Sequence, residues 1–193
     1  AALCLLAHLL TLGRARRLCL NVITPPMCRA LMWAMGIKVH FHGFEKLPSP
    51  CIVTANHTST IDMFIIRMMP IANLRSFLAR WSRVYLPLAV IGYATGTIYT
   101  PPQRYPKKRI RCFQRAEERL RSSGDSCYLS PEGIRWTTPQ VGPFNKGTFH
   151  LAANLSWPIV PVYIDIPRRI NPGVGFKSRP GTVHVYARPP VDT

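Results

Sequence analysis

Residues 56–62 read N-H-T-S-T-I-D and contain two side chains that could do chemistry together, His57 and Asp62. In an ideal helix, positions five apart are about 140° out of phase, so these side chains can meet only if His57 precedes the helix. The apolar run C-I-V-T-A before the motif predicts a buried strand, and Ser59 is a candidate N-cap for a helix over about 60–69. His57 is therefore expected in a strand-to-helix turn at the carboxyl edge of a sheet, where α/β active sites lie.

A carboxylate that accepts a hydrogen bond from one imidazole nitrogen leaves the other nitrogen free to act as a general base. The chain has no G-x-S-x-G nucleophile motif, so the hydroxyl to be activated would belong to the substrate. A His57–Asp62 pair of this kind predicts direct acyl transfer. The alternative is a capping box, because Ser59-x-x-Asp62 also has the spacing in which Asp62 only caps a helix.

A second cluster follows a later predicted strand, in C-Y-L-S-P-E-G-I-R at 127–135. It places Glu132, Gly133 and Arg135 where that strand ends, and Lys146 stands at the start of the next predicted helix. A guanidinium and a helix N-terminus are both suited to binding a phosphate, and a carboxylate can accept from a substrate hydroxyl. An ordinary P-E-G turn is the alternative.

Composition limits the classes of partner without choosing among them. The chain has 193 residues, which suits one globular domain, and its net charge of +17 is distributed along the whole sequence. Nucleic acid, an anionic membrane surface and phosphorylated substrates would each explain that charge, as would a solvated basic surface. The six cysteines form no C-x-x-C pair and indicate buried thiols in a reducing compartment.

Short apolar strands alternate with helical stretches from residue 37 onward, which predicts an α/β fold with a mixed, mostly parallel sheet flanked by helices. The stretch 131–146 is too long for a structureless connection in a compact domain and is expected to be functional. The expected strands lie at 37–43, 51–55, 75–79, 96–99, 128–130, 159–164 and 183–188, and the expected helices at 60–69, 82–94, 106–123 and from Gly147.

The N-terminal 36 residues are apolar and basic, and we expect them to form a helical segment at a membrane interface, followed by an α/β domain over 37–193. The apolar run 1–12 is shorter than the roughly 20 residues that a membrane-spanning helix needs. Pro25-Pro26 is expected to break the next apolar stretch into two short helices. The alternative is that these helices pack on a soluble core.

In this order along the chain, the motifs resemble those of the lysophosphatidic acid acyltransferase (glycerolipid acyltransferase) family. The N-H-T-S-T-I-D motif matches the family's N-H-x-x-x-x-D, and S-P-E-G-I-R at 130–135 matches its F-P-E-G-T-R. The family's second motif is similar to G-T-I-Y at 96–99 with Arg104, and its fourth to P-I-V-P-V at 158–162. Phe144-Asn145-Lys146-Gly147 matches the family's F-K-x-G.

The resemblance implies roles for particular residues. His57, oriented by Asp62, would remove the proton from a glycerolipid hydroxyl, which attacks the thioester of an acyl donor. Main-chain amides at Thr58 and Ser59 are candidates for stabilising the oxyanion. The substrate-binding residues would be Arg104, Glu132, Gly133, Arg135 and Lys146, of which the two arginines and the glutamate would hold the acceptor's phosphate and glycerol.

The resemblance also implies partners. The expected acceptor is 1-acylglycerol-3-phosphate, and the donor is acyl-CoA or acyl-carrier protein as a co-substrate, with no other cofactor, no metal and no nucleic acid. The expected location is the reducing side of a bacterial inner membrane or of a eukaryotic organelle membrane such as the mitochondrial one. The alternative function is that of a structural subunit of a larger membrane or ribonucleoprotein complex that keeps the acyltransferase fold.

Overall fold

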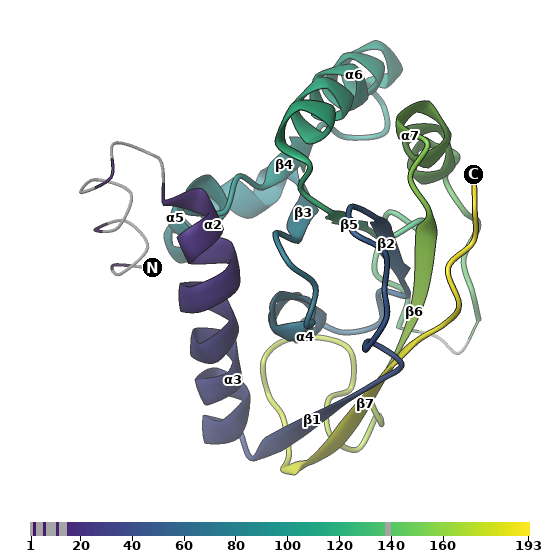
Figure 1. Ribbon diagram of the computed structural model, residues 1–193. Coiled ribbons are helices and arrows are strands. Elements are labelled where there is room, and N and C mark those ends of the chain that lie inside the picture. The colour runs from purple at the N-terminus through teal and green to yellow at the C-terminus, as the bar shows by residue number, and fades with distance from the viewer. Residues whose placement is uncertain (1, 3–5, 7–10, 12–14, 138–139) are drawn as a thin grey trace.

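A seven-stranded sheet forms the centre of the computed structural model (Figure 1), which describes residues 2, 6, 11, 15–137 and 140–193. The strand order is β1-β7-β6-β2-β5-β3-β4, and every neighbouring pair is parallel except β6 and β7. The predicted mixed, mostly parallel sheet is therefore confirmed. The strands are β1 (Ile37–His42), β2 (Ile52–Ala55), β3 (Arg75–Ala79), β4 (Ile98–Thr100), β5 (Cys127–Leu129), β6 (Ile159–Asp165) and β7 (Gly181–Ala187).

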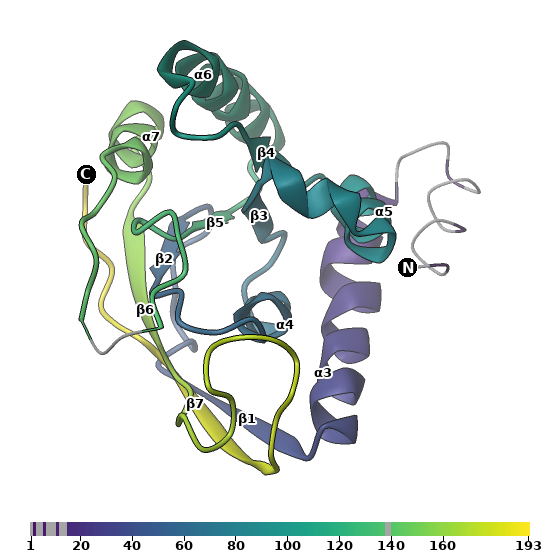
Figure 2. The same cartoon turned by 180° about the vertical axis from the view of Figure 1, so that it is seen from behind.

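Helices cover both faces of this sheet, as the opposite views in Figures 1 and 2 show. One predicted helix was wrong. The stretch 82–94 forms two elements, because an extended residue, Tyr85, separates a short 3-10 helix from α5. The helical elements are α2 (Arg16–Leu18), a π-helical turn η1 (Cys19–Ile23), α3 (Thr24–Ala34), α4 (Asp62–Met68), the 3-10 helix η2 (Arg80–Val84), α5 (Leu86–Ala94), α6 (Pro106–Ser123) and α7 (Gly147–Leu155).

The two larger hydrophobic cores form because side chains alternate between the two faces of each strand. Val53 of β2 packs in one core with Met32 of α3 and Ile65 of α4. Ile52, its neighbour, packs in the other core with side chains of α6 and α7 that include Leu120. The five described cysteines are free thiols and most are buried, as expected. Both strand ends that carry the candidate chemistry, those of β2 and β5, are thus held from two sides.

The expectation that Pro25-Pro26 breaks the N-terminal helix was wrong. Helical structure runs from Arg16 to Ala34, because both prolines occupy the first turn of α3, where their missing N–H groups cost least. The wider π-helical turn before them adjusts the backbone, and the Thr24 hydroxyl donates to the Cys19 carbonyl at 2.7 Å.

The described part of residues 1–36 has a buried face and an exposed face. Cys28 and Met32 belong to the same core as the strands, so the helix packs on the α/β unit as well as presenting apolar side chains outward. The large apolar side chains that are exposed between Arg16 and Ala34 are Leu18, Val22, Leu31 and Trp33. Most of residues 1–12 and Arg14 lie outside the described residues. Within the described part of the chain, no helix is both long and apolar enough to cross a bilayer.

Candidate active site

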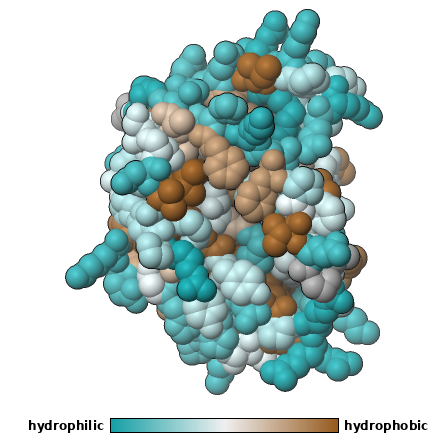
Figure 3. Space-filling view, turned by 90° about the vertical axis from the view of Figure 1, so that its right-hand side faces the viewer, coloured by the Kyte–Doolittle hydropathy of each residue, from teal (hydrophilic) through white to brown (hydrophobic). Residues whose placement is uncertain are grey.

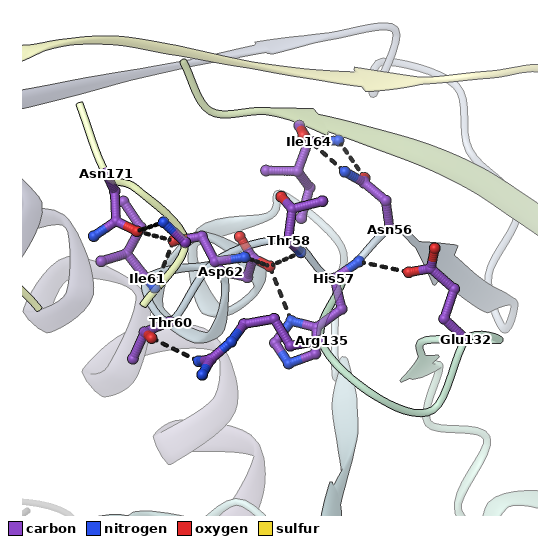
Figure 4. Close-up of polar contacts among 12 residues, drawn as sticks. Asn56, His57, Thr58, Thr60, Ile61, Asp62, Glu132, Arg135, Ile164 and Asn171 are labelled. Carbon is purple, nitrogen blue, oxygen red and sulfur yellow. Dashed lines mark hydrogen bonds and ion pairs between the residues drawn. The ribbon is translucent and has the colours of Figure 1, made fainter. Parts of the chain in front are cut away.

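His57 and Asp62 meet at the carboxyl edge of the sheet, as the sequence predicts (Figure 4). The Nδ1 atom of His57 lies 2.9 Å from Oδ2 of Asp62. The carboxylate is fully buried, whereas the imidazole is 33% exposed. An ionised carboxylate at this distance favours the tautomer with the proton on Nδ1, so Nε2 keeps its lone pair. The pair therefore has the geometry of a general base with one open side.

Asp62 also caps the turn that carries His57, so the contact with the imidazole and the capping contacts occur together. Its Oδ2 atom accepts hydrogen bonds from the main-chain amides of Thr58 and Ser59, each at 2.9 Å. Those amides are therefore already engaged, and the structure does not leave them pointing toward a substrate oxyanion. Helix α4 begins at Asp62 rather than at residue 60, because the Ser59 hydroxyl accepts from the Ile61 amide before the helix starts.

Two asparagines complete the support of this turn, and neither was assigned a role from the sequence. The Asn56 side chain donates to the Ile164 carbonyl at 3.0 Å and accepts from the Ile164 amide at 2.8 Å, which extends the β2–β6 pairing by one rung beyond the strand end. Asn171, in the loop between β6 and β7, accepts from the Ser59 hydroxyl at 2.7 Å. Figures 1 and 2 both place that loop beside α4. The turn is thus held by distant segments that no local pattern reveals.

The Glu132 side chain accepts hydrogen bonds from the main chain and does not project into solvent. It is buried, and its two oxygens accept from the amides of His57 at 3.1 Å and of Gly142 at 3.2 Å. Burial, together with the nearby Asp62 and Glu132 carboxylates, raises the pKa of Tyr128 above its ordinary value, so that phenol stays neutral. Glu132 thus joins the turn that carries His57 to Gly142 in the 131–146 segment, whereas the sequence predicts that it accepts from a substrate hydroxyl.

We expect Glu132→Gln to lower both activity and stability. An amide has one acceptor oxygen, so its NH2 group would face one of the two main-chain N–H donors, at a cost of about 1–3 kcal/mol in the free energy of unfolding. Thermal unfolding and the turnover number of the variant measure the two effects. Glu118→Gln, on the exposed face of α6, is the matched control. A Glu132→Gln protein with wild-type values for both would contradict the positioning role.

The other predicted binding residues gather around the turn after β5. Gly133 has a φ of +69°, and a Cβ there would lie 2.7 Å from Nδ2 of Asn145, so only glycine fits the turn without strain. The Nε2 atom of Gln103, which precedes Arg104 in the chain, donates to Oδ1 of Asn145 at 3.4 Å. Arg104 itself is exposed and lies over the ring of Tyr105. The loop with Arg104 is therefore next to the P-E-G turn.

Arg135 and Lys146 are both exposed but have different neighbours. The Arg135 guanidinium donates to the Thr60 hydroxyl at 2.6 Å, which brings it to the turn that carries His57. The Trp136 amide, one residue later, donates to the His57 carbonyl at 2.8 Å. Lys146 precedes α7 and lines a groove between α6 and α7. Among the predicted cations, Arg135 thus has the most direct connection to the His57–Asp62 pair.

The groove between α6 and α7 has a volume of about 520 Å³ and is lined by both apolar and polar side chains. Ile110, Phe113, Arg109 and Lys146 are among its lining residues. Figure 3 shows the side of the molecule that carries α7 and β6, where a small group of hydrophobic residues is surrounded by a mostly hydrophilic surface. In residues 15–137 and 140–193, no group of His, Cys, Asp or Glu side chains is suited to hold a metal ion.

The fold and the site together define an α/β protein with a buried carboxylate orienting a partly exposed histidine at the carboxyl edge of its sheet. The chain belongs to the acyltransferase family, whose model, described as Acyltransferase, matches residues 38–165.

Individual relatives carry more specific names. The chain is 31% identical over 140 residues to a chloroplastic 1-acyl-sn-glycerol-3-phosphate acyltransferase of Brassica napus, covering 70% of this chain and 39% of that protein. It is 26% identical over 169 residues to the 1-acyl-sn-glycerol-3-phosphate acyltransferase of Pseudomonas aeruginosa, covering 84% of this chain and 64% of that one. The chain thus spans between about two fifths and two thirds of the length of these two curated relatives.

A solved structure shares the fold. The crystal structure of the 1-acyl-sn-glycerophosphate (LPA) acyltransferase PlsC from Thermotoga maritima superposes with a TM-score of 0.69 at 23% identity. The match covers 88% of this chain and 67% of that chain. At this level of identity the similarity demonstrates the fold, including the mixed sheet and its flanking helices.

Proposed function

We propose that this protein transfers a fatty acyl group from a thioester donor to the free hydroxyl of 1-acylglycerol-3-phosphate, giving phosphatidic acid. The observation that carries the proposal is the 2.9 Å contact between His57 Nδ1 and Asp62 Oδ2 at an open sheet edge. Relatives named as 1-acyl-sn-glycerol-3-phosphate acyltransferases support the choice of acceptor. The direct test is transfer of a labelled acyl group to lysophosphatidate from acyl-CoA or from acyl-carrier protein. No transfer from either donor would reject the proposal.

The reaction proceeds without a covalent enzyme intermediate. Nε2 of His57 takes the proton of the acceptor hydroxyl as its oxygen attacks the thioester carbonyl. Asp62 stabilises the imidazolium that forms, and its buried position keeps the ring in the required orientation. When the tetrahedral intermediate collapses, the carbon–sulfur bond breaks and the imidazolium returns the proton to the departing thiolate. The products are the new ester and the free thiol, and His57 is regenerated.

The acceptor's phosphate binds to the cations around the catalytic turn. Arg135 is the main candidate because its guanidinium already contacts Thr60, within the motif that carries His57. Arg104 and Lys146 lie on neighbouring loops linked through Asn145, which also bonds the main chain at Glu132. An exposed guanidinium with free N–H groups can bind a phosphate through two parallel hydrogen bonds.

We expect Arg135→Ala to raise the KM for lysophosphatidate about 10-fold or more, while the KM for the acyl donor changes little. Hydrogen bonds to a charged group contribute about 1.5–3 kcal/mol, and each 1.4 kcal/mol is a factor of ten in binding. Initial rates at varied concentrations of each substrate measure the two constants. Arg111→Ala, at an exposed position of α6, removes the same charge elsewhere and serves as the control. Equal increases in both constants would count against a headgroup role for Arg135.

The exposed apolar side chains of the described residues are suited to binding at a membrane surface. Exposed Leu31 and Trp33 lie on α3, and exposed Trp81, Val84 and Leu86 lie at the start of α5 and just before it. Large apolar side chains beside basic ones are suited to the headgroup region of an anionic bilayer, where a lysophospholipid resides. The relatives, which are named as acyltransferases, give no support to the alternative of a non-catalytic structural subunit.

A further inference from the structure

A second cavity lies at the opposite edge of the sheet from the His57–Asp62 pair. Arg75 at the amino end of β3 and Ser122 and Ser123 at the end of α6 help to form it, whereas His57 and Glu132 follow the carboxyl ends of β2 and β5. Its volume is about 750 Å³. Its lining residues come mainly from α2, α5, β4 and the end of α6, and Figures 1 and 2 show α2 and α5 side by side. Four of its lining side chains are arginines, namely Arg16, Arg75, Arg83 and Arg119.

The charge around this cavity is unbalanced. The only carboxylate that pairs with these arginines within the described residues is the fully buried Asp125. Its Oδ2 atom lies 2.7 Å from Nη2 of Arg75 and 3.3 Å from Nη2 of Arg16, and its Oδ1 atom lies 3.7 Å from Nε of Arg17. One carboxylate therefore forms ion pairs with three guanidinium groups.

Two more cations of the cavity have no carboxylate within ion-pair distance among the described residues: Arg83, which lies over the Tyr99 ring at 4.1 Å, and Arg119. The Nε atom of Arg16 is buried without a hydrogen-bond partner. Desolvation by burial and the adjacent Arg75 lower the pKa of Arg16 from its ordinary value. A bound anion would relieve this repulsion and accept the unused donors.

The cavity also depends on two glycines. A Cβ at Gly96, whose φ is +65°, would lie 2.7 Å from Cδ of Arg16 and 3.4 Å from Nη1 of Arg75. A Cβ at Gly92 would lie 2.0 Å from the hydroxyl oxygen of Tyr99. Both positions line the cavity, so the absence of side chains there gives the arginines access to an anion.

We propose that this cavity, which we call the arginine pocket (Arg16, Arg75, Arg83 and Arg119), binds the phosphate group of an anionic phospholipid headgroup outside the catalytic site. The position of the pocket favours a lipid as the source of the phosphate. Residues of α2 and α5 line the pocket, and both helices carry exposed apolar side chains, Leu18 on α2 and Leu86 and Tyr93 on α5. Tyr93 lines the pocket itself. A phosphate bound there would be at headgroup level when those side chains enter a bilayer.

The test compares two double variants that lose the same charge. Arg83→Ala/Arg119→Ala removes the pocket cations that do not pair with Asp125, so the buried ion pair stays intact. Arg111→Ala/Arg115→Ala removes two exposed cations of α6 that lie outside the pocket and is the control. Flotation with phosphatidylcholine vesicles, alone or containing phosphatidate or phosphatidylglycerol, measures binding at about 0.15 M ionic strength. Circular dichroism and acyl transfer in detergent verify that each variant is folded and has an intact catalytic site.

We expect the pocket variant to lose about 5-fold or more of its affinity for anionic vesicles relative to the control variant, and little for neutral ones. Inorganic phosphate distinguishes the source. If it raises the Tm of the wild type but not of the pocket variant while the two variants bind vesicles equally, the pocket takes a soluble phosphate, and the lipid assignment is overturned. Equal loss of vesicle binding in both variants with no effect of phosphate on Tm overturns the site altogether. Neither result depends on whether the chain transfers acyl groups.

Discussion

His57→Ala should lower the rate of acyl transfer by about 10²–10⁴-fold while the fold persists, because this is the contribution that a positioned general base typically makes. Among the residues that the structure describes, the imidazole is the only group within hydrogen-bond distance of Asp62 that can take up and return a proton, since the other donors to that carboxylate are main-chain amides. Its side chain is partly exposed and belongs to no core cluster, so its removal leaves the packing intact.

The measurement is single-turnover transfer of a labelled acyl group to lysophosphatidate, with thermal unfolding of each variant. His40→Ala, on the exposed face of β1, is the matched control. Asp62→Asn adds a second criterion: if the pair acts as one unit, Asp62→Asn in the His57→Ala background should lower the rate little further. A folded His57→Ala protein with wild-type turnover would exclude the histidine as the base, and multiplicative losses in the double variant would mean that Asp62 acts independently of it.

The parts of the site that could be predicted from the sequence are those set by local patterns. An apolar run followed by a turn and a helix places His57 at a sheet edge, and spacing then brings Asp62 within reach. The same reasoning places Arg135 after β5. Parallel strands align their carboxyl ends, so the two clusters meet although about 75 residues separate His57 from Glu132 in the chain.

The parts that could not be predicted depend on pairings across the chain. Asn171 contacts Ser59 over a separation of 112 residues, and a lone asparagine in a loop has no pattern that distinguishes it from a turn residue. The inward orientation of Glu132 depends on where the Gly142 amide comes to rest, which is a tertiary outcome. The continuous N-terminal helix was missed because a π-helical turn, whose sequence signal is weak, accommodates Pro25 and Pro26.

Asp125→Ala should lower the free energy of unfolding by about 3–5 kcal/mol, the usual cost of removing one partner from a buried ion pair. Arg75 is 4% exposed and Asp125 is fully buried, so water cannot replace the lost carboxylate. Arg75 would be left as an uncompensated buried charge beside Arg16, whose helix the same carboxylate ties to the amino edge of the sheet. The variant should therefore loosen the N-terminal helix as well as the sheet.

Urea unfolding followed by circular dichroism gives the free energy, and hydrogen exchange at the amides of α3 reports on the attachment of the helix. Asp192→Ala, at an exposed position near the end of the chain, is the control for loss of an acidic residue. Adding Arg75→Met to Asp125→Ala should restore part of the lost stability, because replacing both partners by apolar side chains removes the unpaired charge. If the free energy of unfolding of Asp125→Ala were within about 1 kcal/mol of the wild-type value, the carboxylate would not stabilise the arginines as a buried ion pair, since breaking such a pair costs more than that. If the double variant were instead less stable than Asp125→Ala alone, the loss would come from packing around Arg75 rather than from its charge.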